Sequence, residues 1–219
     1  MMRVGIVAEG QSDFQVLEAS MRAVRPDSQF VRLQPDVTLS NPRNGWRGVK
    51  FWCEENGPRL ESIMTGVVGN PLHLLVVHVD CSMADKVSAE RPCPPATDTS
   101  AALRQVVGAT WINLSPIPQF VLIACPAQSH ESWIVATLDP PYQSLANLEC
   151  DKAVEDELAR RKLLRRNAKG EVKKQAIRYQ PLADRVGQMF DLVCERCGTA
   201  AEFRRLFLSA VPLNLEDPT

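Results

Sequence analysis

The feature that most constrains the fold is a short apolar strand that ends in a carboxylate and a glycine and runs directly into a helix. The strand is VGIVA at 4–8, and its β-branched side chains suit a buried position. Gly10 permits a tight turn, and Ser12 is expected to cap a helix that starts near Asp13. Glu9 should therefore lie at the carboxyl end of a strand, beside a helix N-terminus, where α/β proteins place their chemistry.

Two later apolar segments also lead into acids. The segment LHLLVVHV at 72–79 is followed by Asp80, and its near-continuous hydrophobicity fits a central parallel strand covered on both faces. The segment QFVLIA at 119–124 leads into a polar stretch that contains Glu131. A further strand is expected at 29–34, where polar and apolar residues alternate.

Helical segments separate these strands, so the expected order is β-α-β-α-β-α-β-α. This alternation predicts an α/β fold with a mainly parallel sheet, flanked by helices and connected by right-handed crossovers. Residues 35–48 are expected to form a loop and 54–64 a short helix. Beyond Pro141 only helices are expected, so the chain divides into an α/β core at 1–145 and a helical extension at 146–219. The helices expected in the extension cover 151–166, 179–194 and 199–210.

Composition and cysteine usage place the chain among ordinary globular proteins. It has 219 residues and a net charge of -1, which argues against a polyelectrolyte role. The seven cysteines are scattered, and the first residues contain no apolar run long enough for a signal sequence or a membrane span. We therefore expect a cytoplasmic protein with reduced thiols and no membrane segment. Cys194 and Cys197 form a lone CxxC, which predicts core cysteines on a helix better than a four-ligand zinc site.

Parallel topology would bring the strand-end acids together. The carboxyl ends of parallel strands share one edge, so Glu9, Asp80 and Glu131 should meet there, with Asp13 and Asp85 nearby. Clustered carboxylates repel one another unless a cation neutralises them, and Mg²⁺ or Mn²⁺ takes oxygen ligands. The chemistry implied is phosphoryl transfer, with phosphodiester cleavage as its leading form. The alternative is that these acids only cap helices or lie on the surface.

The three histidines are expected to be structural. His73 and His78 lie within the apolar segment at 72–79, where a core histidine is more common than a ligand. His130 stands next to Glu131 and has the chemistry for proton transfer, but a structural or solvated role is the leading expectation.

Several short motifs together resemble a known family. They are EGQSD at 9–13, VDCSMAD at 79–85 and HESW at 130–133, with a C-terminal stretch at 179–208 that includes EFRRLF. The chain resembles compact Toprim-like bacterial proteins, which are distantly similar to the overcoming-lysogenization-defect nucleases. The resemblance implies a Toprim-like, Rossmannoid fold, a metal-dependent nuclease, a role in phage defence and an ATPase partner. The chain has no Walker A motif of its own.

The resemblance also implies roles for individual residues. Glu9 would be a metal ligand or general acid–base, Asp80 a ligand, and Glu131 a further ligand. Toprim domains usually carry a second Asp where this chain has Ser82, so either Ser82 ligates through its hydroxyl, or Asp85 reaches the metal, or the site is weakened. The expected catalytic residues are Glu9, Asp80 and Glu131, and the expected metal ligands are Glu9, Asp13, Asp80, Ser82, Asp85 and Glu131.

Positive charge is concentrated in one segment. Residues 158–178 carry nine Lys and Arg against one acid, Glu171, which is the footprint expected for a phosphate backbone. Cations near Trp46 could likewise hold a phosphate while the ring stacks on a base. The alternatives are a solvated surface or a dock for an acidic partner. The expected nucleic-acid contacts are Arg43, Arg47, Lys50, Arg161, Arg165, Arg166, Lys169, Lys173 and Lys174.

Three functions follow from these patterns. The leading hypothesis is a divalent-metal-dependent nuclease that cleaves DNA or RNA. The alternative is a non-catalytic nucleic-acid-binding or regulatory protein whose Toprim-like site is degenerate at Ser82. A receiver-like phosphoacceptor at Asp80 is the weakest hypothesis, because the chain lacks the acidic pair and lysine at the required strand ends.

Overall fold

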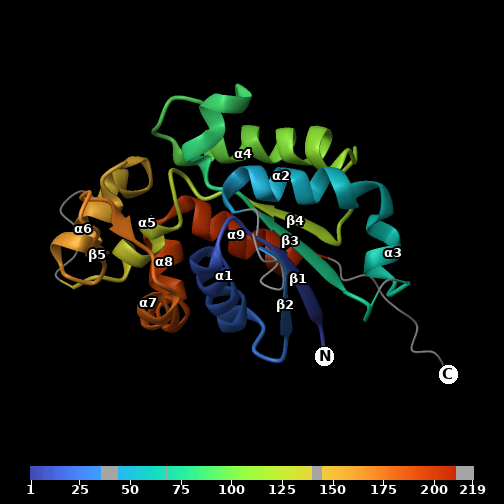
Figure 1. Cartoon of the computed structure of the whole chain (residues 1–219), viewed down its shortest axis with the longest axis horizontal. Helices are drawn as coiled ribbons and strands as arrows, with labels where there is room; N and C mark the ends of the chain where they lie inside the picture. The colour runs from blue at the N-terminus through green and yellow to red at the C-terminus, as the bar shows by residue number, and fades with distance from the viewer. Residues whose placement is uncertain (36–43, 68, 140–144, 211–219) are drawn as a thin grey trace.

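A four-stranded parallel sheet lies at the centre of the molecule (Figure 1). The computed structural model describes residues 1–35, 44–67, 69–139 and 145–210. The strand order is β2-β1-β3-β4. The strands are β1 at Arg3–Val7, β2 at Gln29–Gln34, β3 at Leu74–His78 and β4 at Val121–Ala124. The predicted α/β fold with a mainly parallel sheet flanked by helices is confirmed.

The two inner strands fit their sequences. All five residues of β3 are buried, and the strand pairs with β1 on one side and β4 on the other, as its continuous hydrophobicity predicted. In β1, Gly5 allows close packing, because a Cβ there would lie 2.7 Å from the side-chain ends of Leu33 and Leu72, which would have to shift. His73, just before β3, accepts a hydrogen bond of 3.0 Å from the backbone N–H of Arg3, which is the structural role expected for it.

Helices cover both faces of the sheet (Figure 1). The α-helices are α1 Gln11–Val24, α2 Gly45–Asn56, α3 Leu60–Met64, α4 Ala96–Val106, α5 Glu131–Ala136, α6 Val154–Arg160, α7 Ala176–Gln188, α8 Phe190–Arg196 and α9 Gly198–Ser209. Short 3₁₀ segments occupy Gly57–Arg59, Cys81–Val87 and Leu145–Cys150, and a π turn occupies Val107–Ile112.

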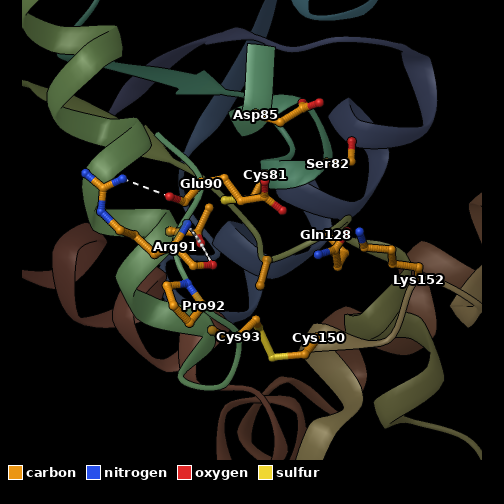
Figure 2. Close-up of a pocket in the computed structure, with 13 residues that line it drawn as sticks. Cys81, Ser82, Asp85, Glu90, Arg91, Pro92, Cys93, Gln128, Cys150 and Lys152 are labelled. Carbon is orange, nitrogen blue, oxygen red and sulfur yellow. Dashed lines mark hydrogen bonds between the residues drawn. A yellow bond between two sulfur atoms is a disulfide. The ribbon is translucent and has the colours of Figure 1, made fainter. Parts of the chain in front are cut away.

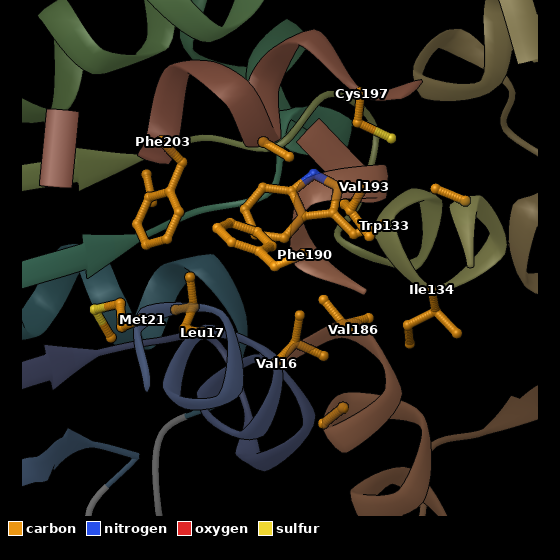
Figure 3. Close-up of a cluster of buried hydrophobic side chains, with 14 of the residues drawn as sticks. Val16, Leu17, Met21, Trp133, Ile134, Val186, Phe190, Val193, Cys197 and Phe203 are labelled. Atoms are coloured by element: carbon orange, nitrogen blue, oxygen red, sulfur yellow. The ribbon is translucent and has the colours of Figure 1, made fainter. Parts of the chain in front are cut away.

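Alternate residues of the strands feed two separate cores. Val4 and Ile6 of β1 belong to the core built with α1, α5 and α7 to α9, whereas Val7 belongs to the core under α2 and α4. Figure 3 shows the first core, where the Trp133 ring lies 6.2 Å from Phe190 and 5.6 Å from Phe203, centroid to centroid. Helices from the expected extension and from the expected core therefore share one buried cluster.

Several expected boundaries are wrong, because tertiary packing overrides local preference. The expected loop at 35–48 ends early, since α2 starts at Gly45 and buries Val49 and Cys53, one turn apart, against the sheet. The expected cap Ser12 does not cap, because α1 starts at Gln11 and its N-cap residue is Gly10.

The extension is not purely helical, which corrects a second expectation. Helix α6 ends at Arg160, and β5 at Arg165–Arg166 then pairs antiparallel with β6 at Val172–Lys173. The turn between them explains this: the Asn167 side chain accepts the backbone N–H groups of Lys169 and Glu171, at 2.9 Å each, and Gly170 has a φ of 81°. We call residues 165–173 the hairpin.

The cysteines depart from expectation at one pair. Cys93 and Cys150 form a disulfide, with their Cα atoms 5.7 Å apart, so the prediction of reduced thiols is wrong for these two. The two cysteines are 57 residues apart in the sequence, so their proximity depends on the tertiary fold and cannot be predicted from their spacing. Cys194 and Cys197 are free thiols; Cys197 is buried in the first core. Across the described ranges, no helix has the length and apolar character needed to span a bilayer.

Candidate metal centre

Acids and histidines meet at the carboxyl edge of the sheet. Glu9 follows β1, Asp80 follows β3, and His130 lies just beyond β4 at the start of α5. Helix α1 then packs on one face of the sheet, while α4 packs on the other. Open α/β sheets bind ligands where successive connections leave on opposite faces, so β1 and β3 frame the expected position.

Four buried side chains form a group that can hold a metal ion: Asp13, His78, Asp80 and His130. One ligand atom from each lies within 4.8 Å of the other three. Nδ1 of His130 is 2.7 Å from Oδ1 of Asp13 and 3.8 Å from Oδ1 of Asp80. Nε2 of His78 is 3.4 Å from the same Asp80 oxygen. We call these four residues the metal group.

Unpaired ring nitrogens support this reading of the group. Both imidazoles are fully buried, and within the described chain Nδ1 of His78 has no hydrogen-bond partner. Nε2 of His78 and Nδ1 of His130 approach the carboxylates of Asp80 and Asp13 but without aligned hydrogen-bond geometry. Buried polar atoms without partners are uncommon and costly. A cation between the carboxylates of Asp13 and Asp80 could bind one nitrogen of each ring, so the residues present fit a metal ion.

The carboxylate of Asp80 is kept ionised in this setting. Burial alone would raise the pKa of Asp80, but contacts with His130 and His78 outweigh burial and lower it. Burial alone would also lower the pKa of His130, whereas the charges of Glu131 and Asp13 raise it well above its ordinary value. Without a metal, a proton on His130 is therefore the cation that balances the group.

Glu9 lies beside the metal group without belonging to it. Its Oε1 accepts a hydrogen bond of 2.8 Å from the backbone N–H of Asp80. Its backbone carbonyl accepts one of 2.8 Å from Gly45, which brings the start of α2 next to it. Burial, reinforced by the charge of Asp80, raises the pKa of Glu9 to about 7. Glu9 is thus a partly exposed carboxyl that can gain or lose a proton near neutral pH.

Glu131 is also held outside the metal group. It is fully buried, and its Oε1 accepts the hydroxyl of Tyr179 at 2.5 Å and the ammonium of Lys174 at 2.6 Å. Burial alone would raise the pKa of Glu131, but the charges of His130 and Lys174 lower it to about 2. Lys174, which is among the expected nucleic-acid contacts, pairs with this carboxylate and with Glu155 at 2.9 Å.

Ser82 and Asp85 line a cavity (Figure 2), as does Cys81, which directly follows Asp80 of the metal group. Both lie on the 3₁₀ segment Cys81–Val87, which turns away after Asp80 because the backbone N–H of Ser82 donates to the carbonyl of Gln128 at 2.9 Å. Both side chains are exposed, and neither belongs to the metal group. The cavity has a volume of about 640 Å³ and is also lined by Glu90, Gln128, Lys152 and the Cys93–Cys150 disulfide.

Several of the expected nucleic-acid contacts that lie within the described ranges are paired with acids. Arg161 binds Glu157 at 2.6 Å, Arg166 pairs with Asp156, and Lys50 lies 3.6 Å from Glu54. The guanidinium of Arg47 lies over the ring of Trp46, and Arg43 lies outside the described residues. Arg165, Lys169 and Lys173 are exposed on the hairpin, where Arg165 stands opposite Lys173.

Sequence reasoning missed His78, His130 and Tyr179 as members of the site. Tyr179 lies 48 residues after Glu131, and no local pattern marks it. His78 and His130 flank acids that were expected, so their position next to Asp80 and Glu131 was the available signal.

Comparison with known proteins leaves the family open. No family model, no curated protein and no solved structure matches the chain. The similarity to Toprim-like proteins therefore rests on the short motifs alone.

Proposed function

We propose that this protein is a divalent-metal-dependent phosphodiesterase that cleaves DNA or RNA. The observation that carries the proposal is the metal group at the carboxyl edge of a parallel sheet, with the titratable carboxyl of Glu9 beside it. A role in phage defence and an ATPase partner are supported by the motif resemblance only.

The donor set favours some ions over others. Asp13 and Asp80 supply carboxylate oxygens, and His78 and His130 supply imidazole nitrogens. Imidazole suits Zn²⁺ and Fe²⁺, and carboxylates suit Mn²⁺, so this mixed set fits a first-row transition metal better than Mg²⁺. When bound, the metal would polarise a phosphoryl oxygen of the substrate and neutralise developing charge.

Glu9 supplies the proton transfer that hydrolysis needs. With a pKa of about 7, its carboxylate and its carboxylic acid are both populated near neutral pH. The carboxylate would take a proton from the attacking water, and the acid would return a proton to the leaving oxygen. Its hydrogen bond from the backbone of Asp80 fixes its position relative to the metal group.

Two neighbouring features support a phosphate substrate. The N-terminus of α2 begins beside Glu9, and unpaired N–H groups at a helix N-terminus favour anions. The cavity of Figure 2 presents Ser82, Gln128 and Lys152, polar groups suited to a nucleotide next to the scissile phosphate. The exposed cations of the hairpin would contact the backbone further along the strand.

The test is cleavage by the purified chain with Mn²⁺, Zn²⁺ or Mg²⁺ on single- and double-stranded DNA and on RNA. We expect Mn²⁺-dependent cleavage that Glu9→Gln and Asp80→Asn abolish. Asp184→Asn, an exposed acid on α7, is the matched control and should cleave normally. Cleavage that persists in both site variants, or no cleavage of any substrate with any metal, would contradict the proposal.

One observation favours a second candidate, a non-catalytic nucleic-acid-binding or regulatory protein. The four side chains of the metal group are all buried, and four protein ligands complete a tetrahedral shell, as in structural zinc sites. In that case the metal would only tie α1 to the end of β3 and the start of α5. Tight binding of one Zn²⁺ with a raised melting temperature, but no cleavage of any substrate, would favour this candidate.

A further inference from the structure

A chain of polar contacts runs from the metal group into the extension. Nε2 of His130 lies 2.8 Å from the hydroxyl of Tyr179, which donates to Glu131 at 2.5 Å. Glu131 in turn accepts from Lys174 at 2.6 Å, and Lys174 also reaches Glu155 at 2.9 Å. His130, Glu131 and Tyr179 are fully buried.

The direction of each hydrogen bond in this chain is determined. Lys174 can only donate, and ionised Glu131 can only accept. The hydroxyl of Tyr179 therefore gives its proton to Glu131, and its oxygen is left to accept from His130. Nε2 of His130 must then carry the N–H. In a neutral ring Nδ1 is left with a lone pair, and this atom faces Asp13 and Asp80.

We propose that Tyr179, Glu131 and Lys174 form a positioning relay that presents Nδ1 of His130 to a first-row transition metal held by the metal group. The inference rests on the metal centre of the proposed function and adds residues to it. Metal-bound histidines commonly donate their second ring N–H to an oxygen that fixes the tautomer and the ring orientation.

Packing alone would not require this arrangement. The ring of His130 already makes edge contacts with Tyr179 and His78, each with centroids 5.8 Å apart, and a phenyl ring at position 179 would preserve the first of them. Burying the carboxylate of Glu131 contributes little to stability even when it is paired, and its Oε2 has no hydrogen-bond partner among the described residues. The specific effect of the relay is to keep the ring proton of His130 on Nε2.

The relay also makes the extension part of the centre. Tyr179 lies on α7, and Lys174 directly follows β6, so both come from the expected extension at 146–219. Glu131 and His130 come from the start of α5 in the expected core. The metal centre therefore draws on both parts of the chain.

The experiment measures metal binding rather than cleavage. Zn²⁺ and Mn²⁺ affinities are determined by calorimetry for the full chain and for Tyr179→Phe, Glu131→Gln and Lys174→Met. We expect one ion per chain, with affinity falling about 10- to 100-fold in Tyr179→Phe and Glu131→Gln. Nitrogen-15 spectra of the Zn²⁺-loaded chain should show His130 bound through Nδ1 with the proton on Nε2, and a changed Nε2 signal in Tyr179→Phe.

Two matched controls separate the relay from general effects of losing a buried charge. Glu157→Gln removes a buried carboxylate that binds Arg160 and Arg161 and is not a member of the relay. Glu155→Gln removes the second partner of Lys174 and leaves Glu131 in place. Both should bind metal with the affinity of the unchanged chain.

The outcomes distinguish the relay from the centre. If the unchanged chain binds neither ion, the metal centre and the relay both fail. If it binds one ion and Tyr179→Phe and Glu131→Gln bind as tightly, with the same His130 spectrum, the relay is overturned and the centre stands. If those two buried variants do not fold, Lys174→Met decides, because this side chain is partly exposed: unchanged affinity and spectrum would overturn the relay.

Discussion

The backbone N–H of Asp80 donates a hydrogen bond of 2.8 Å to Oε1 of Glu9. This bond joins the ends of β1 and β3 through a side chain, across 71 residues of sequence. It keeps two carboxyl groups close together, where they cannot both ionise freely. His78 and His130 lower the pKa of Asp80, so Asp80 carries the negative charge. The pKa of Glu9 is raised.

Glu9 should make stability depend on pH. Its pKa is about 7 in the folded chain and 4.5 ordinarily. Between these values the folded chain binds a proton that the unfolded chain has released, so stability falls as pH rises through this window. We expect Glu9→Gln to remove this slope and to be more stable than the unchanged chain above pH 7, by at most about 3 kcal/mol. Urea unfolding at several pH values between 4.5 and 7, with a chelator present, measures the slope of stability against pH. The exposed Glu61→Gln variant is the control. Equal slopes for all three chains would refute the raised pKa.

Loss of a metal ligand should abolish stabilisation by metal. A ligand at about 100 times its Kd adds roughly 2.7 kcal/mol of stability to the folded state. We expect Mn²⁺ or Zn²⁺ to raise the melting temperature of the unchanged chain, and chelator to reverse the rise. Asp13→Asn and His78→Gln should show no rise, whereas Ser82→Ala and Asp85→Asn should respond fully, because they face the cavity. A lost response in Ser82→Ala or Asp85→Asn would instead support the ligand roles expected from the motifs.

Cations on the hairpin should contribute to nucleic-acid binding rather than to folding. Arg165 and Lys173 are cross-strand partners, and like charges directly opposite each other destabilise a strand pair. We expect Arg165→Ser and Lys173→Ser to keep or slightly raise stability and to weaken binding equally for all sequences. Each should reduce the slope of log affinity against log salt by about 1.

Fluorescence anisotropy with labelled oligonucleotides at several salt concentrations measures this slope. Arg59→Ser, an exposed cation just before α3, is the control and should leave both quantities unchanged. A drop in affinity of the same size in the control would mean that the hairpin has no special role.

The disulfide should be a major contributor to stability under oxidising conditions. Cys93 and Cys150 are separated by 57 residues, and closing a loop of this length in the unfolded chain corresponds to about 4 kcal/mol in the chain-entropy view. We expect Cys93→Ser to lower the urea midpoint, and reduction of the unchanged chain to lower it equally. Cys53→Ser, which removes a buried free thiol, controls for lost packing. An unchanged midpoint on reduction would show that the bond contributes nothing.

The parts of the site that sequence predicted were those set by strand ends. Glu9 and Asp80 were placed correctly because each follows an uninterrupted apolar run, and parallel topology then brings the runs to one edge. Ser82 and Asp85 line the cavity instead of joining the four buried side chains, and the 3₁₀ segment that carries them is held by the backbone of Gln128, a contact between distant segments. The motif pattern carries no information about that contact.

Other features were not predicted from the sequence, for a different reason. The approach of Tyr179 to Glu131 depends on how α7 packs against α1 and α5, and local sequence periodicity does not predict this packing. The hairpin was predictable in principle, because Asn167 and Gly170 have the chemistry of a turn, but the helix expected at 151–166 took in its first strand.

The shared core around Val4 and Phe207 has a consequence for synthesis. Val4 and Ile6 of β1, near the start of the chain, belong to the same core as Phe203 and Phe207 of α9, which is translated last among the described elements. While the ribosome is still adding the intervening residues, Val4, Ile6 and Leu17 lack their final neighbours. Nascent chains with such delayed contacts expose apolar surface for longer. This protein should therefore depend on chaperones during translation more than its modest size would imply.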